Sequence, residues 1–130
     1  MIFVETSAWL ALVDAIDKDH KIANSWFREN SLKFITSNLV IIESLGWIRH
    51  KRGKKEAVTL GKRLLLSPDI TVERVTAVDE KRAWRLFRQV NGRGISMIDC
   101  TSFILMKRLG IKEAFVFDED FKKLGFTTYP

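Results

Sequence analysis

The sequence has few of the residues that mark disulfide-bonded, proline-rich or membrane-spanning proteins. Cys100 is its only cysteine, so no disulfide can form within the chain, and a cytoplasmic protein is the simplest interpretation. Its only prolines are Pro68 and Pro130, which leaves no proline-rich linker, and we expect one domain over residues 1–130. No apolar run approaches the ~18 residues of a membrane helix, and the first residues lack the basic segment of a signal peptide. We therefore expect no membrane association.

An excess of basic residues and a large apolar fraction are the main features of the composition. Lys and Arg number 22 against 16 Asp and Glu, which gives a net charge of +6. This balance favours an anionic partner, with nucleic acid the first candidate, although an ordinary lysine-rich surface gives the same total. Hydrophobic residues make up 46% of the chain, which is enough for a packed core and argues against disorder.

Short apolar runs alternate along the chain with amphipathic stretches, which predicts an α/β protein. We expect strands at residues 2–4, 33–36, 70–75 and 114–117, with a candidate fifth strand at 127–129. The first and fourth runs are apolar throughout, as in strands that a parallel sheet buries on both faces. Two helices are predicted after each of the first three strands, with the fourth helix over residues 54–66.

Hydroxyl side chains mark where several of the predicted helices begin, because they can accept hydrogen bonds from the first amides of a helix. The candidate N-caps are Thr6 or Ser7, Ser37 or Asn38, Thr76, and Ser96. The run from Ser96 to Asp99 has the form of a capping box. That motif would explain Asp99 without any chemistry.

Four acidic residues occupy comparable places in the predicted fold. Glu5 directly follows the first strand, and Asp118 follows the fourth. Glu43 lies about one and a half turns into the third helix, and Asp99 lies in the first turn of the sixth. The carboxyl ends of parallel strands share one edge of the sheet, where α/β proteins bind their ligands. Solvent exposure or a lysine partner is the alternative explanation for Glu43.

Carboxylates brought together at such an edge repel each other unless a cation joins them. Oxygen ligands of this kind suit Mg²⁺ or Mn²⁺, and no set of histidine and cysteine residues supports zinc. A carboxylate-held divalent ion can activate water and neutralise charge on a phosphate, so the acids suit phosphodiester hydrolysis. Basic residues could then contact the nucleic-acid backbone. The candidates, each of which could instead belong to a solvated helix surface, are Arg49, Lys51, Arg52, Lys54, Lys55, Arg85 and Arg93.

Four sequence blocks together resemble a known family. They are IFVETSAWLAL, NLVIIESL, SMIDCTSFILMKRLGI and AFVFDEDF. In this order, and over nearly the whole chain, they resemble the PIN domain, most closely the VapC-type ribonuclease toxins of toxin–antitoxin pairs. The resemblance implies a PIN-like three-layer sandwich, with a central parallel sheet of four to five strands flanked by helices. It also implies a Mg²⁺- or Mn²⁺-dependent endoribonuclease, a homodimer and inhibition by a small VapB-like antitoxin.

The resemblance also implies roles for particular residues. The four acids of the family fall on Glu5, Glu43, Asp99 and Asp118; Ser7 matches a hydroxyl position, and Asp120 is an additional acid. Glu5 departs from the family, which normally has aspartate there. The extra methylene moves the carboxylate by about one C–C bond length, and misplacement near ~1 Å can reduce a rate ~100-fold.

Three functional hypotheses follow from these residues. The first is an RNA-cleaving enzyme in which Glu5, Asp99 and Asp118 hold the ion, and Glu43 holds it or orients the water. By resemblance, cleavage would leave 5′-phosphate and 3′-hydroxyl ends. The second is a catalytically weak or inactive PIN-like module that binds RNA or a protein, which the glutamate at position 5 supports. The third, a receiver-like signalling domain, is disfavoured because the four acids are widely spread in the sequence.

Overall fold

The five strands of the protein run parallel in one sheet, in the order β3-β2-β1-β4-β5. The computed structural model describes residues 1–30 and 32–130. The strands are β1 (Ile2–Val4), β2 (Phe34–Ser37), β3 (Ile70–Glu73), β4 (Glu113–Phe115) and β5 (Thr127–Tyr129). The predicted α/β fold with a parallel sheet, including the candidate fifth strand, is therefore confirmed.

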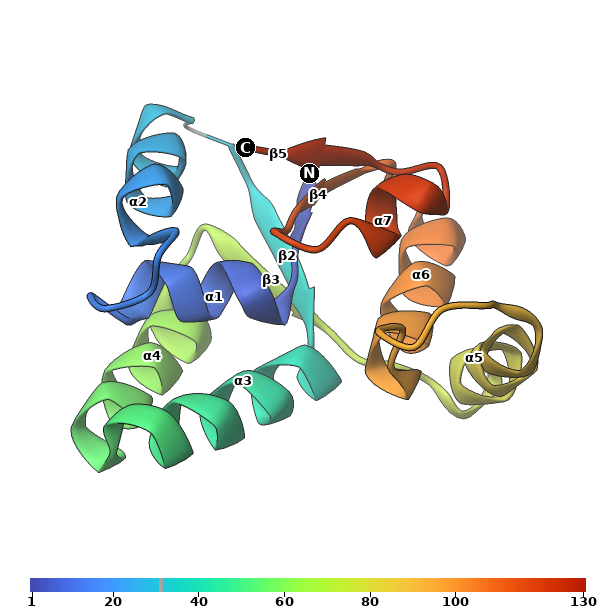
Figure 1. The fold of residues 1–130 in the computed structure, drawn as a ribbon, viewed down its shortest axis with the longest axis horizontal. Coiled ribbons are helices and arrows are strands. Elements are labelled where there is room, and N and C mark those ends of the chain that lie inside the picture. The colour runs from blue at the N-terminus through green and yellow to red at the C-terminus, as the bar shows by residue number, and fades with distance from the viewer. Residues whose placement is uncertain (31) are drawn as a thin grey trace.

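Seven helices in the described part of the chain cover this sheet. They are α1 (Thr6–Val13), α2 (His20–Glu29), α3 (Asn38–Arg52), α4 (Lys54–Leu66), α5 (Ala77–Gln89), α6 (Met97–Leu109) and α7 (Asp120–Lys123). Figure 1 shows α1 to α4 on one face of the sheet and α5 to α7 on the other, which confirms the predicted three layers. None of these helices has both the length and the apolar character needed to span a bilayer.

The central strands β1 and β2 are buried along their whole length, because helices cover both faces of the sheet. Trp9 of α1 is fully buried, and its indole Nε1 donates to the hydroxyl of Thr36 at 3.3 Å. Thr36 in turn donates to the carbonyl of Val4 at 2.9 Å. This chain of hydrogen bonds joins α1, β2 and β1, and it satisfies the buried polar groups of Trp9 and Thr36.

The fourth strand ends earlier than the sequence predicts. β4 stops at Phe115, and the amide of Phe117 donates to the hydroxyl of Ser7 at 3.0 Å instead of pairing along the sheet. Asp118 therefore lies in the loop between β4 and α7, so the prediction that it directly follows the strand is wrong. β2 and β3 also differ from their predicted ranges, by one or two residues at their ends.

The first helix has a different cap from the one predicted. Glu5 is the N-cap of α1, and its carboxylate accepts a hydrogen bond from the amide of Ser7. Thr6 and Ser7 are instead the first two residues of the helix. The prediction is wrong because the carboxylate of Glu5 folds back over the first turn and takes the position of the expected hydroxyl. Glu5 therefore follows β1 directly and is the N-cap of α1.

The other predicted caps are confirmed. Ser37 caps α3 by accepting a hydrogen bond from the amide of Val40. Capping boxes begin α5 and α6, where Thr76 and Ser96 each exchange two hydrogen bonds with the aspartate three residues later. Gly110 ends α6 in the left-handed conformation (φ 68°), which a residue without Cβ adopts at little cost. These contacts are local in sequence, which is why the sequence predicts them.

The strand order places a topological switch point between β1 and β4. The chain proceeds from β1 through β2 to β3 with α1 to α4 on one face, then crosses to β4 with α5 and α6 on the other (Figure 1). Neighbouring strands whose connections leave on opposite faces form a topological switch point, where open α/β sheets bind ligands at the carboxyl edge. Glu5 follows β1 at this edge, and the loop that carries Asp118 follows β4.

Candidate active site

Glu5 is held at the carboxyl edge of the sheet by Ser7. The side chain of Glu5 is 5% exposed, and its Oε2 accepts hydrogen bonds from the backbone amide and the hydroxyl of Ser7, each at 2.8 Å. The same hydroxyl accepts the hydrogen bond from the amide of Phe117. Ser7 therefore fixes the carboxylate and joins the start of α1 to the loop that carries Asp118. It lies where a residue that supports the first acid should lie.

Asp99 enters the same region from the other layer of helices. It is 6% exposed and lies in the first turn of α6, where its Oδ2 accepts a hydrogen bond from the amide of Ser96 at 3.0 Å. The hydroxyl of Ser96 accepts a hydrogen bond from the amide of Asp99, also at 3.0 Å. Within the described residues no hydrogen bond occupies the other carboxylate oxygen, Oδ1. The capping role therefore leaves one oxygen available for a ligand.

Glu43, Asp118 and Asp120 are half-buried. Asp118 accepts a hydrogen bond from the amide of Asp120 at 2.9 Å, which holds these two acids together at the start of α7. The loop between α5 and α6 passes close to them, because a Cβ at Gly94 would lie 3.3 Å from Oδ2 of Asp120. A side chain at position 94 would therefore crowd the acidic edge.

The pKa values show that the predicted acids act on one another. Burial raises the pKa of Glu5 to about 7; the hydrogen bonds from Ser7 oppose this shift, and the charges of Asp99 and Glu43 add to it. Burial likewise raises the pKa of Asp99 to about 6, with further increases from the charges of Asp118 and Glu43. The four acids that the sequence predicts to meet are therefore electrostatic neighbours.

Asp120 belongs to the same group of acids. Its pKa is raised, first by burial and then by the hydrogen bond and negative charge of Asp118, whereas Lys123 lowers it. Nζ of Lys123 lies 3.9 Å from Oδ1 of Asp120, and this ion pair places one lysine beside the cluster. With so little positive charge nearby, the ionised carboxylates repel one another, and a bound cation would relieve this repulsion.

The donor set fits a hard divalent cation, although the side chains are not in a ligating arrangement. The clustered groups are all carboxylates, which suit Mg²⁺ or Mn²⁺. In the described part of the chain, no three acidic, histidine or cysteine side chains already have the geometry to hold one ion. Oε2 of Glu5 is bonded to Ser7 and Oδ2 of Asp99 to Ser96, so an ion would be held through their other oxygens or after a change of rotamer.

The basic run after Glu43 divides into one structural residue and several exposed ones. Arg52 donates from Nε to the buried carboxylate of Asp14 at 2.8 Å, and this bond offsets the effect of burial and lowers the pKa of Asp14. Arg52 therefore ties the end of α3 to the end of α1, which leaves it poorly placed to contact a phosphate. The remaining members are exposed and form no ion pair with a described residue; they are Arg49, Lys51, Lys54 and Lys55.

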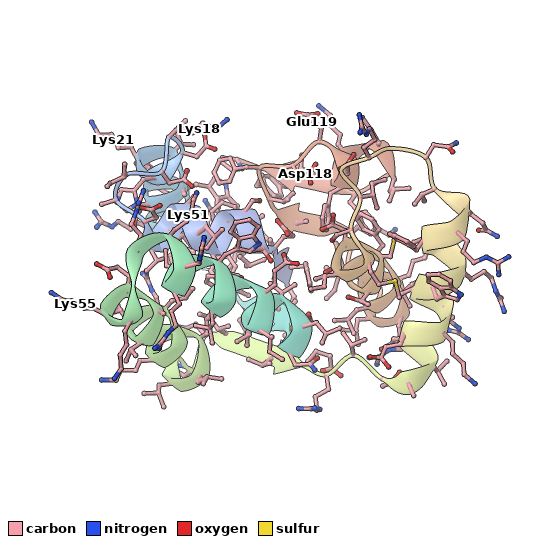
Figure 2. The ribbon with its side chains drawn as sticks, turned by 60° about the horizontal axis from the view of Figure 1, so that its bottom comes forward. Lys18, Lys21, Lys51, Lys55, Asp118 and Glu119 are labelled. Atoms are coloured by element: carbon pink, nitrogen blue, oxygen red, sulfur yellow. The ribbon has the colours of Figure 1, made fainter. Side chains whose placement is uncertain are left out.

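The exposed bases lie in two separate groups. Figure 2 shows Lys51 on α3 between Lys55, at the end of the α3–α4 hairpin, and Asp118, with Lys18 and Lys21 on the same side. Arg85 lies on α5, on the opposite face of the sheet, and lines a pocket of about 430 Å³ together with Arg82 and Lys107. Arg93 is exposed in the loop between α5 and α6. The sequence-predicted bases are thus not one continuous patch.

A pocket beside the acids contains residues that the sequence analysis did not select. It has a volume of about 390 Å³ and is lined by Ser7, Leu10, Asp17, Lys18, Asp19, Phe117 and Asp118. Leu10 lies three residues after Ser7, so helical spacing alone could have indicated it. Lys18 and Phe117 lie in loops, and no local pattern marks them.

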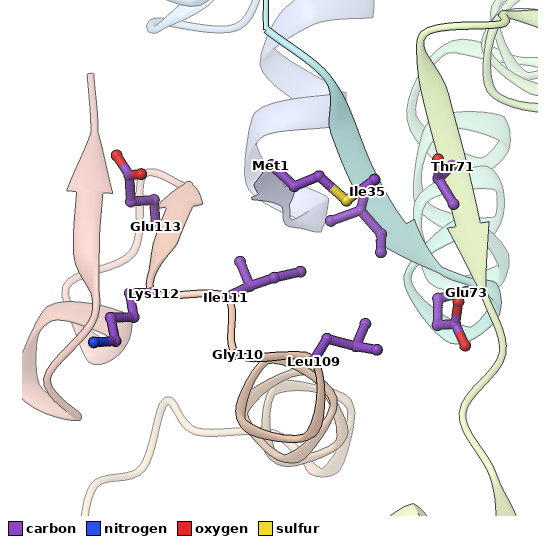
Figure 3. Close-up of a pocket in the computed structure, with 9 residues that line it drawn as sticks. All are labelled: Met1, Ile35, Thr71, Glu73, Leu109, Gly110, Ile111, Lys112 and Glu113. Carbon is purple, nitrogen blue, oxygen red and sulfur yellow. The ribbon is translucent and has the colours of Figure 1, made fainter.

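A larger pocket lies elsewhere and contains none of the four predicted acids. Its volume is about 610 Å³, and it opens where the end of α6 leads into β4, with Met1, Ile35 and Thr71 on the opposite wall (Figure 3). Glu73 and Glu113 border it, but neither belongs to the acidic cluster. Size alone therefore does not identify the site, and the clustered carboxylates do.

Comparisons with known proteins agree with this fold. The chain matches the PIN domain family over residues 2–127. It is 37% identical over 126 residues to the 23S rRNA-specific endonuclease VapC20 of Mycobacterium tuberculosis, which covers 97% of this chain and 95% of that protein.

Solved structures give the same relationship. The crystal structure of Mycobacterium tuberculosis VapC20, described as a Sarcin-Ricin loop cleaving toxin, superposes with a TM-score of 0.92 at 36% identity and covers 98% of this chain and 97% of that one. The crystal structure of FitAcB from Neisseria gonorrhoeae has a TM-score of 0.68 at 15% identity, covering 100% and 97% of the two chains, and supports the fold alone. The chain therefore belongs to the PIN domain family and, within it, to the VapC-type toxins.

Proposed function

We propose that this protein is a divalent-metal-dependent endoribonuclease that hydrolyses phosphodiester bonds of RNA. The observation that carries the proposal is a cluster of carboxylates at the switch point of the sheet, in which burial and the charges of neighbouring acids raise the pKa of Glu5 and Asp99. Glu5, Asp99 and Asp118 would hold Mg²⁺ or Mn²⁺, and Glu43 would hold the ion or orient a water molecule. When bound, the ion supplies water activation and neutralises charge on the phosphate.

The chain's own residues position these groups. Ser7 orients Glu5 through two hydrogen bonds, and Ser96 orients Asp99 through its backbone amide. Asp120 supports Asp118 through its own amide. On the basic side, Arg49, Lys51, Lys54 and Lys55 remain candidates for contacts with the RNA backbone, as do Arg85 and Arg93, because all are exposed.

The relatives suggest a substrate and partners. Because VapC20 is a 23S rRNA-specific endonuclease that cleaves the Sarcin-Ricin loop, and shares more than a third of its residues with this chain, we propose the same rRNA loop as the first substrate. We also propose inhibition by a small VapB-like antitoxin and assembly as a homodimer. A cytoplasmic location belongs to the same proposal, because the ribosomal substrate is found there.

A second candidate function is an RNA- or protein-binding module with little catalytic power. The observation that favours it is Glu5, whose carboxylate is longer than the family's aspartate and is already turned to Ser7. If neither oxygen of this carboxylate reaches the ion, one proposed ligand is missing. The two candidates differ in whether bound metal leads to cleavage.

A cleavage assay distinguishes these candidates. A synthetic Sarcin-Ricin loop RNA is incubated with the chain in EDTA, Mg²⁺ or Mn²⁺, and the fragments are mapped. We expect cleavage only with an ion, loss of cleavage in Asp99→Asn, and full activity in Asp69→Asn, whose exposed carboxylate lies in the turn before β3. Tight Mn²⁺ binding without cleavage of this RNA or of total rRNA would instead favour the binding module. Full activity in Asp99→Asn would remove Asp99 from the mechanism.

A further inference from the structure

Trp47 differs from the other three tryptophans in its surroundings. Trp9 is fully buried and hydrogen-bonded, and Trp26 stacks on Tyr129 at 5.4 Å between ring centroids. Trp84 stacks on Phe87 at 5.9 Å. Trp47 is 53% exposed, and within the described residues it has no aromatic, cationic or hydrogen-bonding partner. With about half of its surface exposed, Trp47 is accessible to a binding partner.

The position of Trp47 on α3 directs it toward the acidic cluster. Glu43, Trp47 and His50 are spaced by four and three residues, so they share one flank of the helix. α3 follows β2 directly at the carboxyl edge of the sheet and packs against α6, which carries Asp99, so Glu43 in the second turn of α3 lies at this edge. Trp47 therefore lies one helical turn from Glu43 at the rim of the acidic edge.

The neighbours of Trp47 are charged or polar and do not form an apolar stripe. Lys51 lies four residues further along α3 and is exposed, as is His50. The exposed Ile42 lies about 140° around the helix from Trp47, so the two do not form one apolar surface. An amphipathic partner helix requires several apolar contacts on one face. An aromatic ring beside a cation is instead the combination that binds single-stranded nucleic acid, through base stacking and phosphate contact.

We propose that Trp47 is a base-stacking residue of the RNA site, which receives an unpaired base next to the scissile phosphate while Lys51 contacts the adjoining backbone. This inference rests on the proposed function and deepens it, because it requires RNA with a base free to unstack, as in a loop. It makes Trp47 a determinant of which nucleotide lies beside the cut. Every base can stack on an aromatic ring, so we expect this residue to select unpaired nucleotides and not a particular base.

The first test compares cleavage of the Sarcin-Ricin loop RNA by matched tryptophan variants. Trp84→Ala is the control, because Trp84 is 54% exposed against 53% for Trp47 but lies on α5, in the other helical layer. We expect Trp47→Ala to lower kcat/KM roughly 10- to 100-fold, in line with the stacking of one base. Trp47→Phe should recover most of the loss, and Trp84→Ala should stay within about twofold. Equal losses in the two alanine variants would overturn the proposal.

A second test uses RNAs in which one nucleotide near the cut is replaced by an abasic site. With the wild-type protein, we expect one position to reduce kcat/KM as strongly as Trp47→Ala does. With Trp47→Ala, the same abasic site should cause no further loss, because the base and the ring form one interaction. Additive losses would overturn the proposal, since a merely structural effect of Trp47 does not depend on that base.

These measurements separate the stacking role from the nuclease itself. A protein that cleaves RNA equally well with and without Trp47 overturns the stacking role and leaves the nuclease intact. If that variant also escapes a VapB-like antitoxin, Trp47 belongs to a protein interface, which again overturns RNA stacking. Binding of the loop RNA that depends on Trp47 but leads to no cleavage supports stacking and overturns the endonuclease.

Discussion

The carboxylate of Glu5 has two competing roles. As the N-cap of α1 it accepts two hydrogen bonds from Ser7, and as a member of the acidic cluster it faces the charges of Asp99 and Glu43. An aspartate at this position could also cap the helix, since aspartate is among the best N-cap residues. Its shorter side chain would hold the carboxylate closer to the backbone. The identity of this residue therefore affects both the helix start and the geometry available to an ion.

We expect Glu5→Asp to increase metal-dependent RNA cleavage. A displacement of about 1 Å in a catalytic group can change rates by up to ~100-fold, and the family normally has aspartate here, so a gain of roughly tenfold is reasonable. The measurement is kcat/KM on the same RNA at saturating Mn²⁺. Glu119→Asp is the control, because Glu119 is exposed beside Asp118. No gain, or a loss, would show that the glutamate is already well placed.

Asp79 and Asp99 form the same capping box in different electrostatic surroundings. Asp79 accepts hydrogen bonds from Arg108 at 2.9 and 3.0 Å; these bonds outweigh burial and lower the pKa of Asp79. Asp99 has no such partner among the described residues, and its pKa is raised to about 6. The motif alone therefore does not say whether the acid stabilises the fold. That depends on whether the group facing the aspartate is a cation, as for Asp79, or another acid, as for Asp99.

Replacing each aspartate by asparagine should have opposite effects on stability. At pH 7.5 without a divalent ion, Asp99→Asn removes a repelled, buried charge and should raise the free energy of unfolding by about 2 kcal/mol. Asp79→Asn leaves Arg108 without its partner and should lower that free energy by about 2 kcal/mol. Urea unfolding of both variants measures the difference. Destabilisation by Asp99→Asn would show that its capping bonds outweigh the repulsion.

The hairpin of α3 and α4 packs against α1, and in the described part of the chain an ion pair also joins them. Arg52 at the end of α3 reaches Asp14 just after α1, and the side chain of Asp14 is 4% exposed. Removing one partner of a buried pair leaves an uncompensated charge, whereas removing an exposed charge changes little. The same basic run thus contains a residue that holds the helices together and residues with no such role in the described structure.

We expect Arg52→Ala to lower the free energy of unfolding by about 2 kcal/mol, somewhat less than for a fully buried pair because Arg52 is itself partly exposed. Arg49→Ala, three residues earlier on the same helix, should change it by less than about 0.5 kcal/mol. Urea unfolding measures both. If the two variants are equally stable, the bond between Arg52 and Asp14 contributes nothing in solution.

The carboxyl edge of the whole sheet gathers negative charge that the fold does not neutralise. The protein carries a net charge of +6, yet among the described residues no ion pair joins a base to Glu5, Glu43, Asp99 or Asp118. Such a concentration of negative charge attracts a cation. It also makes stability depend on pH and on metal.

We expect the metal-free protein to become less stable as pH rises from about 4 to about 7. The pKa values of Glu5 and Asp99 are raised in the folded state, so that state binds more protons than the unfolded chain in this window, and stability falls as the protons leave. Mn²⁺ should therefore raise Tm more at pH 8 than at pH 5.5. Thermal unfolding with and without Mn²⁺ tests this.

Asp99→Asn is the control for this pH dependence and should flatten both the pH slope and the Mn²⁺ effect. A metal-free Tm that increases steadily from pH 5.5 to pH 8 would contradict the raised pKa values. A Mn²⁺ effect that is equal at both pH values would indicate that the ion binds outside the acidic cluster.

The sequence by itself determined the features that depend on near neighbours. The apolar run of β1, the cap at Ser37 and the capping box at Ser96 follow from burial patterns and from hydrogen bonds within a few residues. That Glu5 and the loop carrying Asp118 lie at the same edge of the sheet was also predictable, because parallel strands bring their carboxyl ends to one edge.

Only the tertiary structure decided the features that depend on distant residues. The amide of Phe117 donates to Ser7, 110 residues earlier in the chain, and not to a neighbouring strand, so Asp118 lies in a loop. Arg52 pairs with Asp14, 38 residues earlier. The pKa of Glu5 and the solitary exposure of Trp47 likewise depend on which elements pack against them. Contacts of this kind form when helices and strands are placed in space, so no local pattern in the chain encodes them.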